Sequence, residues 1–161
     1  MNLKAATEQD ASFLFTLFEA QKTAELGLDN VDIHFKNSII SMQWNSKNQS
    51  YLHRFPDLQT FVILYEEQAV GSCMIHYTPQ EIHMIDILIS SSFRNLSIGT
   101  LLFKQLQLEA QQQKIPLRLQ VAIGNPAQRL YERLGFNIYQ SDQVYLSMEW
   151  IPSSSQSTIS C

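Results

Sequence analysis

The turn that follows residues 82–89 has the residue types of an anion-binding site. Residues 82–89, IHMIDILI, are nearly all apolar, which is typical of a strand buried on both faces. A second apolar pattern, with helical spacing, begins at Ile98. Between the two patterns the chain reads Arg94, Asn95, Leu96, Ser97, Ile98, Gly99 and Thr100. Small residues at a helix N-terminus let backbone N–H groups approach an anion, so this turn predicts a site for a phosphate-bearing ligand.

A lone carboxylate interrupts the apolar run before the turn. Side chains alternate along a strand, so His83 shares one face with Ile85 and Ile87, while Asp86 shares the other with Leu88. A buried carboxylate without a partner is costly. Asp86 is therefore expected either to meet a substrate or to pair structurally with Arg118 on a neighbouring strand.

These residues need a scaffold that alternates helices with strands. The hydrophobic patterns predict strands over 3–6, 60–65, 69–77, 82–89, 117–121, 136–139 and 144–150. They predict helices after the N-cap Thr7, over 33–45, from Ile98 to about Lys114, and from Asn125-Pro126 to the stop at Gly135. The polar residues 45–49 read as a loop, although a helix could bridge them. Hairpins beside strand-helix-strand crossovers require an α/β fold in which helices pack on a mixed sheet.

Composition narrows the class of protein. The 161 residues hold 11 Lys+Arg against 15 Asp+Glu, a net charge of −4, which argues against nucleic-acid or membrane partners. No apolar run reaches membrane-spanning length, and the N-terminus lacks the apolar core of a signal peptide, so a cytoplasmic protein is expected. Cys73 and Cys161 do not have metal-ligand spacing, and no metal is predicted. One domain is expected over residues 1–151, with a Ser-rich, disordered tail over 152–161.

Two motifs resemble those of the GNAT superfamily of N-acyltransferases. The stretch from Phe93 to Thr100 resembles its acetyl-CoA pyrophosphate loop, [RQ]-x-x-G-x-[GA]. The stretch from Asn125 to Phe136, NPAQRLYERLGF, is similar to its N-x-A-x-x-x-Y-x-x-x-G-F segment. The resemblance implies a GNAT fold, a mixed and mostly antiparallel sheet of about seven strands flanked by about four helices. It also implies an acetyl-CoA-dependent N-acetyltransferase.

The resemblance assigns the cofactor contacts to the turn, to the end of the preceding strand and to the second motif. The implied cofactor-binding residues are Leu88, Ile89, Arg94, Asn95, Leu96, Ser97, Ile98, Gly99, Thr100, Asn125, Ala127 and Tyr131. A bulge near Leu88 and Ile89 would let the backbone pair with the pantetheine arm.

Three positions depart from the family pattern. Ser97 stands where the family has its first loop glycine, and it is costly there if the position needs φ > 0. Asn95 stands where a glycine or small polar residue is frequent. Ser91 replaces a proline, which leaves the entry to the loop less rigid.

Acetyl transfer to an amine needs a neutral amine, a stabilised tetrahedral intermediate and a proton for the thiolate. The resemblance makes Tyr131 the proton donor, His83 the base and Asp86 a contact of the substrate amine. A plainer interpretation exists for each residue: a core aromatic for Tyr131, a structural strand histidine for His83 and an ion pair with Arg118 for Asp86. Asn125 can be a helix cap, a cofactor contact or both.

The acceptor pocket of the superfamily lies between the first two helices and the central strands, where Gln43, Trp44 and Tyr51 are expected. Aromatic side chains there are also common in a core. The expected reaction is direct transfer from acetyl-CoA to a primary amine of a small molecule through a ternary complex. The alternatives are a protein or peptide N-acetyltransferase, and a non-catalytic acyl-CoA-binding regulatory protein on the same fold. A homodimer is possible, because the last strands often pair between protomers in this superfamily.

Overall fold

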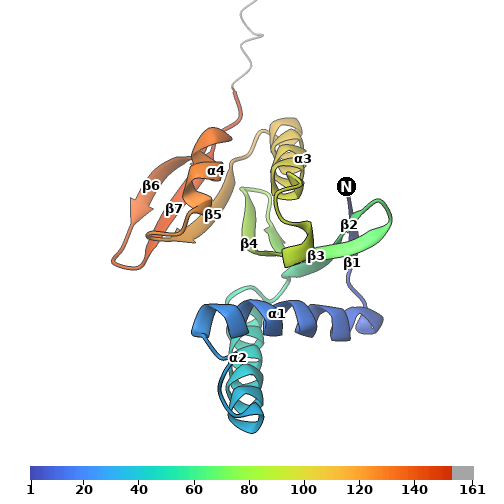
Figure 1. The fold of residues 1–161 in the computed structure, drawn as a ribbon. Coiled ribbons are helices and arrows are strands. Elements are labelled where there is room, and N and C mark those ends of the chain that lie inside the picture. The colour runs from blue at the N-terminus through green and yellow to red at the C-terminus, as the bar shows by residue number, and fades with distance from the viewer. Residues whose placement is uncertain (154–161) are drawn as a thin grey trace, which may run out of the picture. The chain divides into compact units, whose positions relative to one another are not determined.

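The computed structural model describes residues 1–153 and contains a seven-stranded mixed sheet (Figure 1). Its strands follow the order β1-β2-β3-β4-β5-β7-β6. The β4–β5 pair is parallel, whereas β1–β2, β5–β7 and β6–β7 are antiparallel. The predicted fold class and element order are therefore confirmed.

The strands are β1 (Asn2–Ala5), β2 (Gln59–Tyr65), β3 (Gln68–Tyr77), β4 (Ile82–Ile89), β5 (Leu117–Ala122), β6 (Asn137–Ser141) and β7 (Tyr145–Trp150). The α-helices of the described residues are α1 (Ala11–Leu26), α2 (Ile33–Arg54), α3 (Ile98–Gln113) and α4 (Ala127–Arg133).

The chain divides into two compact units, each described here by itself. Unit 1 contains Met1–Met74 and Asp86–Arg94, and unit 2 contains Ile75–Ile85 and the chain from Asn95 onward. Two of the three boundaries fall inside strands, in β3 and β4, and the third, between Arg94 and Asn95, lies in the turn before α3. The single domain over residues 1–151 stays a prediction. From Ser154 onward, the predicted tail lies outside the described residues.

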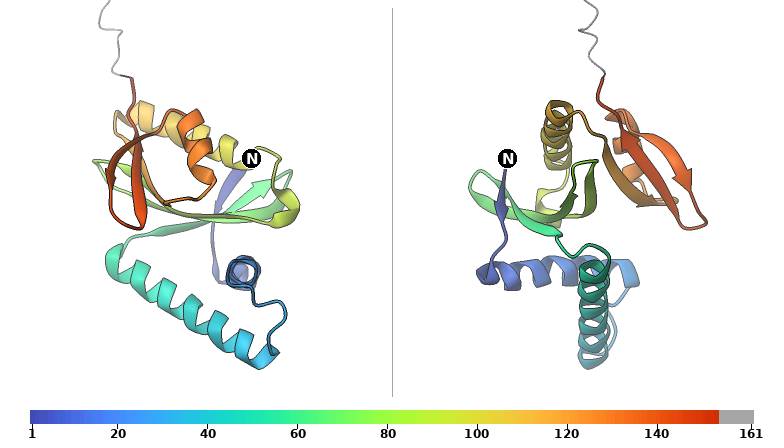
Figure 2. Two further views of the ribbon diagram at one scale, coloured as in Figure 1. Left: turned by 60° about the vertical axis from the view of Figure 1, so that its left-hand side comes forward. Right: turned by 180° about the vertical axis from the view of Figure 1, so that it is seen from behind.

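The helices of unit 1 begin and end at clear sequence signals. Thr7 and Asp10 form a capping box ahead of α1, and Gly27 ends that helix with φ 64°. Asp32 caps α2 by accepting from the backbone amides of His34 and Phe35. In Figures 1 and 2, α2 runs across α1 rather than alongside it.

The second helix is longer than predicted. It continues through the polar residues 45–49 and ends at Arg54, before Phe55, whose position ahead of Pro56 disfavours helical backbone. Its inner face joins the core of unit 1, where Phe18, Leu28 and Ile40 are buried.

Unit 2 has one apolar and one polar sheet face. Along β5, Leu117, Leu119 and Val121 are buried, and α3 contacts this strand with its own buried side chains. The polar side chains lie on the opposite face. There, one row of paired positions crosses β4, β5, β7 and β6: His83 pairs with Arg118, Arg118 with Glu149, and Glu149 with Asn137. Figure 2 shows β5, β7 and β6 side by side.

Candidate functional site

Asn95 and Ser97 both have left-handed backbone in the turn before α3. Their φ angles are 66° and 60°. The concern that Ser97 occupies a position needing φ > 0 is thus confirmed. This conformation costs an ordinary residue roughly 1–2 kcal/mol, and asparagine tolerates it better than serine does.

The N-terminus of α3 is open. The amide of Leu101 donates to the carbonyl oxygen of Ser97 at 3.0 Å, which begins the helical ladder. The amides of Ile98, Gly99 and Thr100 therefore precede that ladder. The Ser97 side chain makes no capping hydrogen bond, and the first turn contains no acidic residue. This arrangement suits a negatively charged ligand group, because the helix dipole adds to amides that have no partner within the helix.

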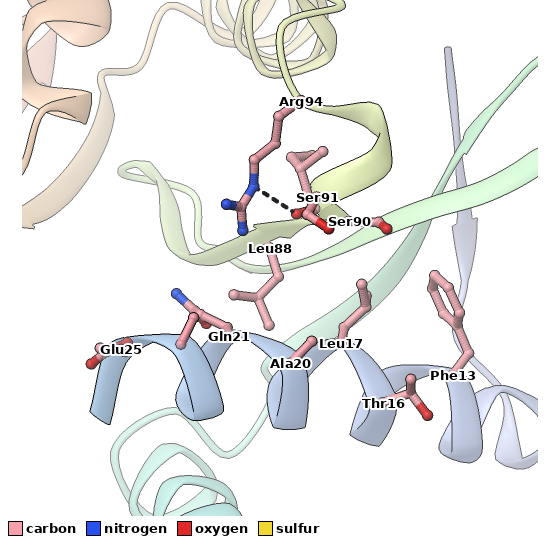
Figure 3. A pocket seen from close by; sticks show the side chains of 12 residues that line it. Phe13, Thr16, Leu17, Ala20, Gln21, Glu25, Leu88, Ser90, Ser91 and Arg94 are labelled. Carbon is pink, nitrogen blue, oxygen red and sulfur yellow. Dashed lines mark hydrogen bonds between the residues drawn. The ribbon is translucent and has the colours of Figure 1, made fainter. Parts of the chain in front are cut away.

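A pocket of about 610 Å³ lies in unit 1 between α1 and the end of β4, and we call it the α1 pocket (Figure 3). It brings together three predicted cofactor-binding residues, Leu88, Ile89 and Arg94. The Nε of Arg94 donates to the carbonyl oxygen of Ile89 at 3.4 Å. The α1 side of the pocket is formed mainly by Phe13, Thr16, Leu17, Ala20 and Gln21.

Sequence reasoning missed the α1 side of this pocket. Phe13 and Leu17 are apolar residues of the predicted first helix, and both line the α1 pocket. Phe18 of the same helix belongs to the core of unit 1 and lines the α2 pocket described below. The signal was present in the sequence, but the pattern alone does not distinguish a pocket wall from a core.

A second pocket of about 400 Å³ lies in the same unit, and we call it the α2 pocket. Its lining includes Asp86 together with Gln43 and Tyr51, two of the three residues that the resemblance places at an acceptor pocket. Gln21 lines both pockets, so they adjoin. Trp44 is a correction: it does not line this pocket, and its ring packs against Phe15 and Phe18, with centroids 5.4 and 5.1 Å apart.

The partner of Asp86 is Lys47. Its Nζ donates to Oδ2 of Asp86 at 2.7 Å. The alternative partner, Arg118, instead binds Glu81 through Nη1 at 3.0 Å and Glu149 through Nε at 2.9 Å. The predicted pairing of Asp86 with Arg118 was therefore wrong, because the polar residues 45–49 are helical and bring Lys47 to the strand.

His83 lies beside this arginine network. Its Nδ1 is 3.7 Å from Oε2 of Glu81, whose other oxygen accepts from Arg118. Burial works against the charge of Arg118, but the hydrogen bonds that its guanidinium donates to Glu81 and Glu149 outweigh burial and raise the arginine pKa. Glu81 is thus a carboxylate available to orient His83.

Tyr131 is buried in an aromatic cluster. Its ring packs edge-on against Phe103 and Phe136, with centroids 5.2 and 6.0 Å apart. The N-cap position of α4 is Pro126, and the side chain of Asn125, one residue earlier, accepts from the amide of Ala127 at 2.9 Å, as a capping residue does. The core packing expected of the Tyr131 ring is also present, and it fixes where the phenol group sits.

A family model described as "Acetyltransferase (GNAT) family" matches residues 27–136. The chain belongs to this GNAT family. It is therefore an acyltransferase enzyme. No curated protein matches its sequence.

Solved structures share the GNAT fold. The PaiA N-acetyltransferase of Thermoplasma acidophilum, in complex with coenzyme A, is 13% identical, with 93% of this chain and 98% of that chain covered and a TM-score of 0.69. The N-acetyltransferase PseH of Campylobacter jejuni, in complex with acetyl coenzyme A, is 16% identical, with 94% and 99% covered and a TM-score of 0.61. At these identities the likeness shows the fold alone.

The described cysteine of this GNAT chain is unsuited to covalent catalysis. Cys73 is 1% exposed in β3. Burial, and then the charge of Asp86, raise the pKa of its thiol to about 12, so the reactive thiolate is scarce. Within residues 1–153, no group of three metal-ligating side chains occurs and no helix is long and apolar enough to cross a membrane.

Proposed function

We propose that this GNAT protein transfers an acetyl group from acetyl-CoA directly to a primary amine of a small molecule, through a ternary complex. The observation that carries the proposal is the family match over residues 27–136, which contains both the 93–100 turn and the 125–136 segment. Two similar structures contain coenzyme A or acetyl coenzyme A, which supports the same co-substrate here.

The open start of α3 supports cofactor binding. In this proposal the amides of Ile98, Gly99 and Thr100 hold the pyrophosphate, together with the turn from Arg94 to Ser97. Leu88 and Ile89 hold the pantetheine arm by strand-like backbone pairing, and Asn125 and Ala127 add contacts from the second motif. The volume of the α1 pocket is within the range of small-ligand sites.

The proposed chemistry uses a base and an acid on the chain. The lone pair of the amine nitrogen forms a bond to the thioester carbonyl carbon while the π electrons of the C=O bond move to its oxygen, and the amine proton passes to His83, which Glu81 orients. The carbonyl then re-forms as the carbon–sulfur bond breaks, and the hydroxyl of Tyr131 gives its proton to the leaving thiolate. Proton exchange with solvent returns His83 and Tyr131 to their starting states. Proton acceptance by Asp86 is less well supported, because its carboxylate already binds Lys47.

The α2 pocket supports a small acceptor. Its volume of about 400 Å³ is also within the small-ligand range, and its lining combines aromatic rings with side-chain donors. Gln43 and Tyr51 are proposed to contact the acceptor there.

Two measurements test the proposed function. Calorimetric titration should show binding of acetyl-CoA, and release of the free thiol should then depend on added amine. Failure to bind acetyl-CoA would overturn the proposal. Binding without amine-dependent thiol release over a broad amine panel would instead favour a non-catalytic acyl-CoA-binding protein.

A further inference from the structure

The ammonium group of Lys47 is fixed inside the α2 pocket. Its Nζ lies 2.7 Å from Oδ2 of Asp86, and the two side chains are only 16% and 24% exposed. The same Nζ lies 5.0 Å from the ring centroid of Phe18 and 6.0 Å from that of Tyr51. A carboxylate and two aromatic faces therefore hold this cation in one place, at a site where water screens it weakly.

This ion pair changes what the pocket can accept. A cationic acceptor that uses Asp86 must first displace Lys47 or place a second ammonium beside it. Like charges at such distances repel each other, and displacement would leave Lys47 without its partner. The structure thus disfavours acceptors recognised by a second positive charge.

The other charges that line the α2 pocket also disfavour a cationic acceptor. Two lysines, Lys22 and Lys47, line it together with a single carboxylate, that of Asp86. Lys22 pairs with Glu25 at 3.1 Å, but the Glu25 side chain is 51% exposed, so this pair neutralises little. The lining therefore has an excess of positive charge.

Neutral donors accompany this charge. Gln43, Ser46, Lys47 and Ser50 recur at helical spacing, so one stripe of α2 faces the pocket. Lys47 uses one of its three N–H bonds on Asp86, which leaves two for an acceptor. Such donors form strong, charge-assisted hydrogen bonds with anionic oxygen groups, and a carboxylate is the compact group of this kind that a small primary amine can carry.

We infer that the α2 pocket takes a primary amine that also carries a carboxylate, as an amino acid does, and that Lys47 selects it. The inference rests on the proposed acetyl transfer. Asp86 then acts as a positioning residue that holds Lys47 rather than as the handle for the acceptor amine. Because Gln21 lines both pockets, an acceptor anchored at Lys47 can extend toward Leu88 and Ile89.

A matched amine panel tests the inference. Thiol release from acetyl-CoA is measured with amino acids and their decarboxylated counterparts: lysine with cadaverine, ornithine with putrescine, tyrosine with tyramine. The expected kcat/KM with the preferred amino acid exceeds that of its counterpart by about 10- to 100-fold, the value of a charged hydrogen bond. A wild-type protein that prefers the decarboxylated amines overturns the inference, whatever the variants do.

Variants at Lys47 provide the second arm. Lys47→Met should remove the preference and admit the decarboxylated amine, since Asp86 is then available to an ammonium. Lys47→Arg should keep the preference. Lys36→Met, on the same helix outside the pocket, is the control and should leave the ratio unchanged. An unchanged ratio in a folded Lys47→Met protein overturns the inference.

Calorimetric binding of the amino acid to the CoA-loaded protein separates the two proposals. Binding that Lys47→Met abolishes, without thiol release from any amine, supports the inference and contradicts the proposed function. Thiol release confined to decarboxylated amines supports the proposed function and contradicts the inference. No binding of any amino acid contradicts the inference alone.

Discussion

A Cβ atom on Gly71 would lie 2.4 Å from the carbonyl oxygen of Leu88. Gly71 is in β3, and the chains on either side are tied together there, because the amide of Ser90 donates to the carbonyl oxygen of Val70 at 2.8 Å. The glycine is needed for space, because its neighbour is backbone that cannot rotate away. Leu88 and Ile89 line the α1 pocket, so the close approach also fixes a pocket wall.

Gly71→Ala should therefore destabilise the protein by about 1–3 kcal/mol, as overpacking does, and weaken acetyl-CoA binding. Denaturant unfolding and calorimetry measure the two effects. Gly99→Ala is the control for stability, because a Cβ there meets only Leu130 at 3.8 Å, an ordinary contact. Wild-type stability in Gly71→Ala would contradict the close approach.

Ser97→Gly should stabilise the protein. Glycine removes a left-handed strain of roughly 1–2 kcal/mol, and its greater freedom in the unfolded chain returns about 0.5–1 kcal/mol of that gain. A higher urea midpoint is the expected result, whereas Ser97→Val should lower it because a branched Cβ fits φ 60° poorly. A Ser97→Gly protein less stable than wild type would show that the serine is favourable there.

Tyr131→Phe should reduce turnover far more than cofactor affinity. The ring contacts with Phe103 and Phe136 remain, while the proton donor is lost. Removal of a general acid lowers kcat by about 10²- to 10⁴-fold. Steady-state kinetics beside calorimetry makes the comparison, with Tyr145→Phe on β7 as the control. Unchanged turnover in Tyr131→Phe would contradict the role of Tyr131 as proton donor and would show that its ring only packs in the core.

Asp142 makes stability depend on pH. Hydrogen bonds from the backbone amides of Tyr145 and Val144 lower its pKa below the ordinary value of 3.8. A carboxyl group whose pKa falls on folding stabilises the protein above its unfolded pKa, and the effect disappears as the pH drops through the folded value. The melting temperature of the wild-type protein should therefore exceed that of Asp142→Asn at neutral pH, and the two should be equal in strong acid.

Melting temperatures across pH measure this difference. Asp29→Asn, at an exposed turn, controls for loss of a surface charge. A gap between wild type and Asp142→Asn that persists below the folded pKa would exclude the carboxylate as its source.

Local patterns predicted the elements of the fold well, because strands, helix caps and helix ends are determined mainly by residues that are neighbours in the sequence. The end of α2 was missed for the opposite reason. Residues 45–49 are polar, and the partners that Lys47 finds, Asp86 and Phe18, are remote in sequence.

In the candidate site, too, features set by local sequence were predictable, and features set by contacts remote in sequence were not. The left-handed turn at Ser97 was predictable, because the residue stands in a glycine position of a recognised motif. That Asp86 needs a partner was also predictable from the cost of burying a carboxylate. The identity of that partner, Lys47, was not predictable, because it depends on how α2 crosses to β4. Trp44 was misplaced similarly, because helical spacing does not tell a core aromatic from one in a pocket.

Initial rates of thiol release, measured while both acetyl-CoA and the preferred amine are varied, test the central claim most directly when the product is identified by mass spectrometry. The account predicts intersecting double-reciprocal lines and an amine product that has gained one acetyl group. No amine-dependent thiol release, or parallel lines with an acetylated protein as intermediate, would contradict it.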